Sequence, residues 1–223
     1  MQTSDLVFVQ SMLPFWDRLS EEDAALLTQH VRAMTYAPGE NVHSGSNDCV
    51  GVLLIQSGEL RAYILSDEGK EITLFRLAAG EVCVLSASCL LHSITFDLFI
   101  DAVDETKLCL IDTQAFSQLM ERNIYVENFA LRITTERFSD VMWAMEQILF
   151  MSFDRRLAIF LLDETAKTGV DNLTMTHEQI ARFVGSAREV VSRMLKYFAK
   201  EGMVAVHRGG VEILDKQKLR KLL

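Results

Sequence analysis

A run of charged and polar side chains near the C-terminal end of the chain has the composition of a surface that contacts DNA bases. Arginine donates two hydrogen bonds to guanine, glutamate accepts from the amino group of cytosine, and serine serves either role. Apolar residues recur between these positions at helical spacing, so we expect the polar side chains to share the opposite side of one helix. A charged helix face that is merely solvated has the same composition. The neighbouring elements must therefore distinguish a DNA-contacting surface from a solvated one. The candidate residues of this helix are Ser186, Arg188, Glu189, Ser192, Arg193 and Lys196.

The residues before this helix predict a second helix start about ten positions earlier. Thr176 with Gln179 matches a capping box, and Ser186 with Glu189 matches another. Gly185 lies between them and can adopt the left-handed conformation that ends a helix. A short helix, a tight turn and a second helix make a helix-turn-helix, whose second helix enters the DNA major groove. Thr176 therefore joins the candidate DNA-binding residues.

A hairpin is predicted directly after the second helix. Residues 203–214 alternate apolar and polar side chains around Gly209 and Gly210, which form a strong two-residue turn signal. Such a hairpin resembles the wing of a winged helix. Arg208 precedes the turn and is a candidate for phosphate contact, although an exposed arginine at a turn is also common without any role.

The distribution of charge supports a DNA-binding C-terminal segment in an otherwise acidic protein. The whole chain has a net charge of −9. Residues 1–122 carry 7 basic and 18 acidic side chains, whereas residues 171–223 carry 10 basic and 6 acidic side chains. The positive segment contains the predicted helix-turn-helix, as contact with phosphates requires.

Composition also argues against several other classes of protein. No apolar run approaches the roughly 18 to 20 residues of a membrane span, and the first residues lack a secretion signal, so we expect a cytoplasmic protein. The four cysteines form no Cys-x-x-Cys pair and are expected to be reduced. Nucleophile motifs, phosphate loops and zinc-site spacings are missing from the sequence, so we predict no catalytic residue, metal or cofactor.

The first half of the chain predicts helices followed by an antiparallel β sandwich or barrel. Residues 5–35 have helical character, and turn signals then punctuate short apolar runs between residues 36 and 112. Residues 51–56 and 60–65 are expected to be paired strands. Residues 71–77 are expected to pair back across the turn at residues 67–69.

A long helix is predicted over residues 123–151, which contain neither glycine nor proline. At about 1.5 Å per residue it would be roughly 40 Å long. It has two apolar stripes, so it needs two partners, its own β domain and a second subunit. A helix buried entirely within one domain is the alternative. The first stripe contains Val126, Ala130, Ile133, Val141, Ala144 and Ile148, and the second contains Leu131, Phe138, Met142, Met145 and Leu149.

The order of these elements resembles that of the CRP/FNR family of bacterial transcription regulators. The resemblance is most specific at residues 187–195, which are similar to the family's recognition helix, and at the glycine turns of residues 38–40, 57–59 and 79–81. It implies an α+β fold with an N-terminal antiparallel β-roll or jelly-roll effector domain over residues 1–122. A dimerisation helix over residues 123–151 and a winged helix-turn-helix over residues 152–223 would follow.

The resemblance also implies specific partners. Arg188, Glu189 and Arg193 match the base-reading positions of cyclic AMP-dependent members, and Glu189, Ser192 and Arg193 match those of FNR-like members. We therefore expect a homodimer on double-stranded DNA, bound to a palindrome with TGA-containing half-sites about one helical turn apart. RNA polymerase is a further candidate partner. A cupin-type metal enzyme is the rival class, but His43 and His92 are the only histidines of the β region and have no motif spacing.

The effector region departs from the family. Cyclic-nucleotide members hold the ligand phosphate with an Arg-Ser pair, whereas here no arginine lies between Arg76 and Arg122. A buried phosphate needs a fixed cation or several donors, so we expect neither cyclic AMP nor cyclic GMP to bind well. An unknown uncharged effector, a redox signal or constitutive DNA binding remain as alternatives. The candidate pocket contains Cys83, Leu85, Ser86, Ser88 and Cys89.

The cysteines leave two interpretations open. FNR members carry an iron–sulfur cluster on an N-terminal cysteine group, and the first cysteine here is Cys49, so that cluster is not expected. Cys83 and Cys89 are either a redox or metal-binding pair or, as free cysteines usually are, small apolar core residues. His92 alone is weak evidence for haem.

Overall fold

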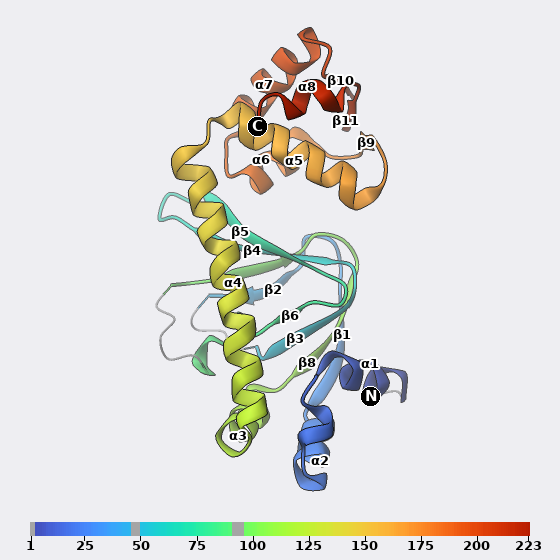
Figure 1. The fold of residues 1–223 in the computed structure, drawn as a ribbon, viewed down its shortest axis with the longest axis vertical. Helices are drawn as coiled ribbons and strands as arrows, with labels where there is room; N and C mark the ends of the chain where they lie inside the picture. Colours follow the sequence, from blue (N-terminus) through green and yellow to red (C-terminus); the bar gives the residue numbers. More distant parts are fainter. Residues whose placement is uncertain (1–2, 46–49, 91–95) are drawn as a thin grey trace. The chain divides into compact units, whose positions relative to one another are not determined.

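The computed structural model describes residues 3–45, 50–90 and 96–223, except for the side chains of residues 88–90 (Figure 1). The chain has an α+β fold, as predicted. It divides into two compact units. The first comprises residues 1–70 and 74–142, and the second comprises residues 71–73 and 143–223.

Helices begin the first unit and return at its end. Ser20 caps helix α2 (Glu21–Gln29), since its hydroxyl accepts a hydrogen bond from the backbone N–H of Asp23 at 3.1 Å. The helical character expected up to residue 35 is wrong, because a strand begins at Val31 and pairs with Ile111. The helical elements are α1 (Thr3–Met12), η1 (Trp16–Arg18), α2 (Glu21–Gln29), η2 (Leu85–Leu90), α3 (Thr113–Arg122) and α4 (Ile124–Phe150).

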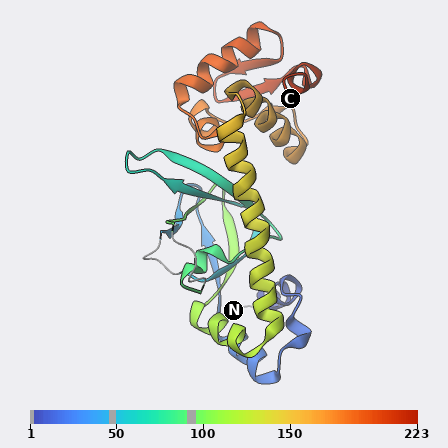
Figure 2. The same cartoon turned by 60° about the vertical axis from the view of Figure 1, so that its left-hand side comes forward.

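Two four-stranded sheets make up the β part of the first unit (Figure 2). One has the strand order β1-β8-β3-β6 and the other has the order β2-β7-β4-β5. The strands are β1 (Val31–Tyr36), β2 (Asn41–Ser44), β3 (Val52–Ser57), β4 (Glu59–Leu65), β5 (Glu71–Ala78), β6 (Val82–Cys83), β7 (Phe99–Ala102) and β8 (Thr106–Ile111).

The predicted pairing of residues 51–56 with residues 60–65 is wrong. These residues form β3 and β4, which belong to different sheets. Only Gly58 separates the two strands, and it has a φ of +82°. A two-residue hairpin turn cannot form there, so the chain crosses from one sheet to the other. The other predicted pairing is correct, since β4 and β5 are neighbours across the turn at residues 67–69.

The hydrophobic core of the first unit lies between one sheet and the helices. Leu54 and Ile111 contribute from β3 and β8, and Phe116 and Ala130 contribute from α3 and α4. The rings of Phe15 and Phe129 meet edge to face, with centroids 5.2 Å apart. Helix α4 is thus anchored to the β-roll by the start of its first apolar stripe.

The two apolar stripes of α4 differ in exposure. Val126, Ala130 and Ile133 of the first stripe are buried, as expected for contact with the β part of the chain. The first stripe becomes half-buried or exposed from Val141 onward. The whole second stripe is exposed in the single chain, with Phe138 at 63%. Its exposed members are Leu131, Phe138, Met142, Met145 and Leu149.

The second unit consists of four helices and a three-stranded sheet of order β10-β11-β9. Gly169, with a φ of +72°, ends α5 in the left-handed conformation that glycine favours. Within the described residues, no helix is long and apolar enough to cross a membrane. The elements after α4 are α5 (Phe153–Thr168), β9 (Asn172–Leu173), α6 (His177–Val184), α7 (Arg188–Lys200), β10 (Val204–His207), β11 (Gly210–Ile213) and α8 (Lys216–Arg220).

Candidate nucleic-acid interface

Helix α6 starts at the predicted capping box. The Thr176 hydroxyl accepts from the Gln179 backbone N–H at 3.2 Å, and the Gln179 side-chain oxygen accepts from the Thr176 backbone N–H at 2.8 Å. Two of the backbone donors at the start of the helix are thereby satisfied. Thr176 itself is exposed.

The turn between α6 and α7 is built on Gly185, which has a φ of +62°. The backbone N–H groups of Gly185 and Ser186 both donate to the carbonyl oxygen of Ala181, the latter at 2.9 Å. A side chain at Gly185 would be strained, since residues with a Cβ rarely adopt this conformation. The glycine therefore fixes the sharp change of direction between the two helices.

The second predicted capping box is wrong. The N-cap of α7 is Ala187, which makes no side-chain hydrogen bond, and Ser186 is half-buried in the preceding turn. The physical reason is the turn itself, because closing α6 through the Ser186 backbone N–H shifts the start of α7 by one residue. The first-turn N–H groups of α7 consequently receive no cap from a side chain of that residue.

Helix α7 has one buried and one exposed side. Val191, Leu195 and Phe198 are buried in the core of the second unit, and Val190 and Met194 are half-buried. Four of the candidate base-contacting side chains are exposed, whereas Ser192 is half-buried. The side that packs inward thus fixes which residues face outward. The exposed candidates are Arg188, Glu189, Arg193 and Lys196.

The predicted wing is present. Strands β10 and β11 pair antiparallel from Val204 opposite Ile213 to His207 opposite Gly210. The turn is made by Arg208 and Gly209 rather than by the predicted Gly209 and Gly210, because Gly210 already pairs with His207 as the first residue of β11. Gly209 has a φ of +83°, and Arg208 is exposed. A Cβ added at Gly210 would lie 2.4 Å from the His207 ring, so the glycine makes room for that imidazole.

A hollow of about 420 Å³ lies between the start of α6, the start of α7 and the wing. It brings the predicted residues Thr176 and Arg188 together. It also contains His177, Glu178 and His207, which the sequence reasoning missed. Their positions in the sequence could have indicated both histidines as candidates. His177 directly follows the predicted cap residue Thr176, and His207 directly precedes Arg208 of the predicted wing.

The two histidines differ in their surroundings. His207 Nε2 lies 2.8 Å from the side-chain oxygen of Asn172, which orients its ring. Burial lowers the pKa of His177 below its ordinary value, and the positive charges of Arg188 and Lys196 lower it further. The positive charges near His177 are therefore of the kind that attracts an anion.

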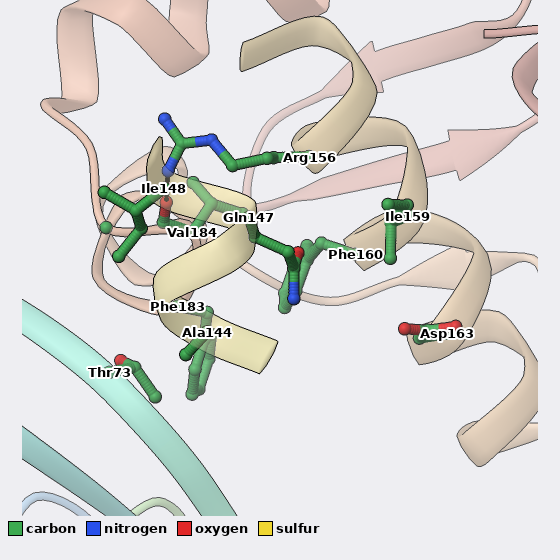
Figure 3. Close-up of a pocket in the computed structure, with 11 residues that line it drawn as sticks. Thr73, Ala144, Gln147, Ile148, Arg156, Ile159, Phe160, Asp163, Phe183 and Val184 are labelled. Carbon is green, nitrogen blue, oxygen red and sulfur yellow. Dashed lines mark hydrogen bonds between the residues drawn. The ribbon is translucent and has the colours of Figure 1, made fainter. Parts of the chain in front are cut away.

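A second hollow, of about 140 Å³, lies behind α6 in the same unit (Figure 3). Arg156 of α5 reaches the end of α6, where its Nη1 donates to the Val184 carbonyl oxygen at 3.0 Å. The rings of Phe160 and Phe183 stack beside it with centroids 5.6 Å apart. A cation at the carbonyl end of a helix is stabilising, so Arg156 supports the position of the turn.

The candidate effector residues of the first unit are only partly described. Cys83, Leu85 and Ser86 are buried. The Ser86 hydroxyl donates to the Gly51 carbonyl oxygen at 2.6 Å. The side chains of Ser88 and Cys89 lie outside the described residues, as do Cys49 and His92.

The described cysteines Cys83 and Cys109 lie in surroundings that disfavour the thiolate. Burial raises the pKa of the Cys83 thiol, and burial raises the pKa of Cys109 to about 11. Both are free thiols. Within the described part of the chain, no three metal-ligating side chains gather into a possible metal site. The pairing of Cys83 with Cys89 stays a prediction.

Comparison with known proteins agrees with this arrangement. Residues 33–123 match the cyclic nucleotide-binding domain, and residues 155–222 match the Crp-like helix-turn-helix domain. A crystal structure of a protein described as a transcriptional regulator of the crp/fnr family, from Eubacterium rectale, is 43% identical and covers 95% of this chain and 98% of its own, with a TM-score of 0.91. The chain belongs to the CRP/FNR family of transcription regulators.

Two further members of the CRP/FNR family are similar to the chain at lower identity. The transcriptional activator protein anr of Pseudomonas aeruginosa is 26% identical over 90% of this chain and 84% of its own length. The cyclic AMP receptor protein of Thermus thermophilus is 24% identical over 94% of this chain and 96% of its own length. This CRP/FNR protein is therefore a DNA-binding transcription regulator and not an enzyme, which removes the cupin alternative.

Proposed function

We propose that this regulator is a homodimer that binds a palindromic operator through α7. The exposed row that starts at the N-terminal end of α7 carries the proposal, because this end contacts bases in helix-turn-helix proteins. Arg188 and Arg193 would donate to guanines, and Glu189 would accept from cytosine. Lys196 extends the same row, and Ser192 lies half-buried beside it. Thr176, Ser186 and Arg208 would contact the phosphate backbone at the edges of the interface.

The second apolar stripe of α4 supports the homodimer. All five side chains of this stripe are exposed in the single chain, and a solvated helix does not normally carry such a row. A second copy of α4 would cover them in a coiled-coil-like seam. Two-fold symmetry would also match a palindrome with two half-sites about 34 Å apart.

We further propose a functional division into residues 1–122 for effector sensing, 123–151 for dimerisation and 152–223 for DNA binding. Residues 123–151 correspond closely to α4. RNA polymerase is proposed as a partner of the bound dimer.

The proposed effector is not a cyclic nucleotide. The described candidate pocket residues Cys83, Leu85 and Ser86 carry no charge, and the Ser86 hydroxyl is engaged by Gly51. Arg137 of α4 brings a cation close enough to Cys83 to interact electrostatically. Its guanidinium is already engaged by two carboxylates, Glu81 and Asp140. A ligand phosphate would have to displace one of them.

The cyclic-nucleotide-responsive regulator is the second candidate, favoured by the matched domain and by a relative named cyclic AMP receptor protein. Isothermal titration calorimetry with cyclic AMP and cyclic GMP separates the two candidates. We expect no heat of binding at micromolar nucleotide. A micromolar dissociation constant for either nucleotide would establish the second candidate.

The DNA-binding proposal is tested with an operator selected from a random duplex library by the full-length protein. We expect the selected sites to be palindromes. Arg193→Ala should weaken operator binding by about 1–3 kcal/mol, or roughly 5- to 150-fold, and relax selection at one guanine position. Lys200→Ala, exposed at the far end of α7, should change affinity much less. Equal binding by Arg193→Ala and the parent protein would remove Arg193 from the base-contacting set.

A further inference from the structure

His177 occupies a position where its protonation state matters for an incoming anion. It is the first residue of α6 and is half-buried at the edge of the hollow shared with α7 and the wing. The first N–H groups of an α-helix have no acceptor inside the helix, so the start of α6 presents donors beside the imidazole. Helix starts of this kind bind phosphate groups.

Charged or polar side chains reach this hollow from each surrounding element. Helix α7 contributes Arg188 to its lining, and Lys196 interacts electrostatically with His177. The wing contributes His207, and α6 itself contributes one carboxylate, Glu178. Arg188 balances Glu178 within the lining, and Lys196 adds a further positive charge near His177, so the surroundings of the hollow favour an anion.

The surroundings of His177 in the free protein disfavour the charged form of its imidazole. Burial lowers its pKa below the ordinary value of 6.5, and Arg188 and Lys196 oppose a further positive charge. A phosphate in the hollow would reverse this balance, because it attracts the imidazolium and screens both cations.

We propose that the hollow binds a backbone phosphate of DNA and that His177 takes up one proton from solvent when the phosphate enters. This inference rests on the proposed DNA-binding function and adds a regulatory property to the same surface. Only the imidazole changes protonation state, and no covalent bond forms or breaks. Operator affinity would then depend on pH through His177, which is not one of the base-contacting residues.

The direction of the effect follows from linkage. DNA raises the pKa of His177, so the extra affinity is fully present below the pKa of the free protein. It is lost as the pH rises through the higher pKa of the complex. Each unit by which DNA raises the pKa of His177 corresponds to a tenfold difference in operator affinity. The difference is that between a pH well below the pKa of the free protein and a pH well above the pKa of the complex.

The test measures operator affinity of the full-length dimer by fluorescence anisotropy at constant ionic strength, from about pH 6 to about pH 8. We expect the parent protein to bind up to about tenfold more tightly at the lower pH. His177→Gln should bind with nearly constant affinity across this range. His177→Arg, which is always charged, should also be insensitive to pH but should retain tight binding at the upper end.

His30→Gln is the matched control. His30 is an exposed histidine at the end of α2 in the first unit, and this variant should retain the full pH dependence of the parent. Thermal unfolding of each variant establishes that it is folded. Nuclear magnetic resonance titration of the His177 ring in the parent protein, with and without operator, should show a higher pKa in the complex.

The outcomes distinguish this inference from the function on which it rests. Specific DNA binding with the same pH dependence in His177→Gln as in the parent would overturn the proton uptake and leave the regulator intact. An unchanged His177 pKa in the complex would overturn it as well. Failure of the parent protein to bind any selected duplex would instead reject the proposed operator binding.

Discussion

Arg137 and Glu81 form an ion pair that fastens helix α4 to a turn of the β-roll, with Nη2 2.9 Å from Oε1. The other Glu81 oxygen accepts from the backbone N–H of Ala78 at 2.7 Å. Arg137 also donates to Asp140 at 2.8 Å, and its guanidinium lies 5.3 Å from the Phe75 ring centroid. Charge, hydrogen bonding and packing therefore meet at one buried side chain of α4.

Removing this arginine should destabilise the first unit. We expect Arg137→Met to lower the free energy of unfolding by about 2 kcal/mol, because hydrogen bonds to charged groups are lost and a partly buried carboxylate loses its partner. Arg132→Met is the control on the same helix, since Arg132 is exposed and its nearest carboxylate lies 3.9 Å away. It should change stability by less than about 0.5 kcal/mol. Urea unfolding followed by circular dichroism measures both, and equal midpoints would contradict the structural role of Arg137.

Two glycines with the same backbone conformation should differ in their tolerance of alanine. Gly58 has a φ of +82°, and an added Cβ would lie 2.5 Å from the Glu105 carbonyl oxygen. Gly69 has a φ of +78° with open space around it. We expect Gly69→Ala to cost about 1 kcal/mol from backbone strain alone and Gly58→Ala to cost about 1–3 kcal/mol more. Thermal unfolding of both variants compares them, and a smaller loss for Gly58→Ala would contradict the close approach.

The exposed stripe of α4 should control the oligomeric state. Phe138→Lys places a charge in the proposed seam and should shift the protein toward monomer in sedimentation velocity experiments. Glu136→Lys is the control, since Glu136 is exposed and lies about 160° around the helix from Phe138. It should leave the dimer intact. A parent protein that sediments as a monomer at micromolar concentration would contradict the seam itself.

The two described cysteines should resist alkylation in the folded protein. Cys109 is fully buried, and its pKa is raised to about 11, so both access and thiolate content are low at pH 8. Burial acts in the same direction on Cys83. Iodoacetamide followed by peptide mass spectrometry should label both residues only after urea is added. Rapid labelling of Cys83 without urea would instead support its role in a redox signal.

Local rules predicted much of the second unit correctly. The cap at Thr176, the left-handed Gly185 and the turn at Gly209 each depend on a few neighbouring residues. The burial of Val191 and Leu195 follows from helical spacing. These features require no knowledge of distant parts of the chain, and the structure confirms all of them.

Predictions failed where distant residues decide the outcome. Glu59–Leu65 pairs with β7 rather than with β3, because both strands are buried and Gly58 allows the chain to change sheets. The hollow at His177 also depends on the return of the wing some 30 residues later in the sequence. Alternation and capping signals describe single elements, so they could not place His207 beside the start of α6.

Helix α7 begins without a side-chain cap, because Ala187 at its N-cap has no side-chain hydrogen-bonding group. A serine, threonine or aspartate at this position would stabilise its first turn by about 1 kcal/mol. DNA phosphates are hydrogen-bond acceptors and can complete the same turn from outside. The first turn of α7 would then become more stable when the protein docks on DNA. Part of the free energy of DNA binding would go into stabilising this turn.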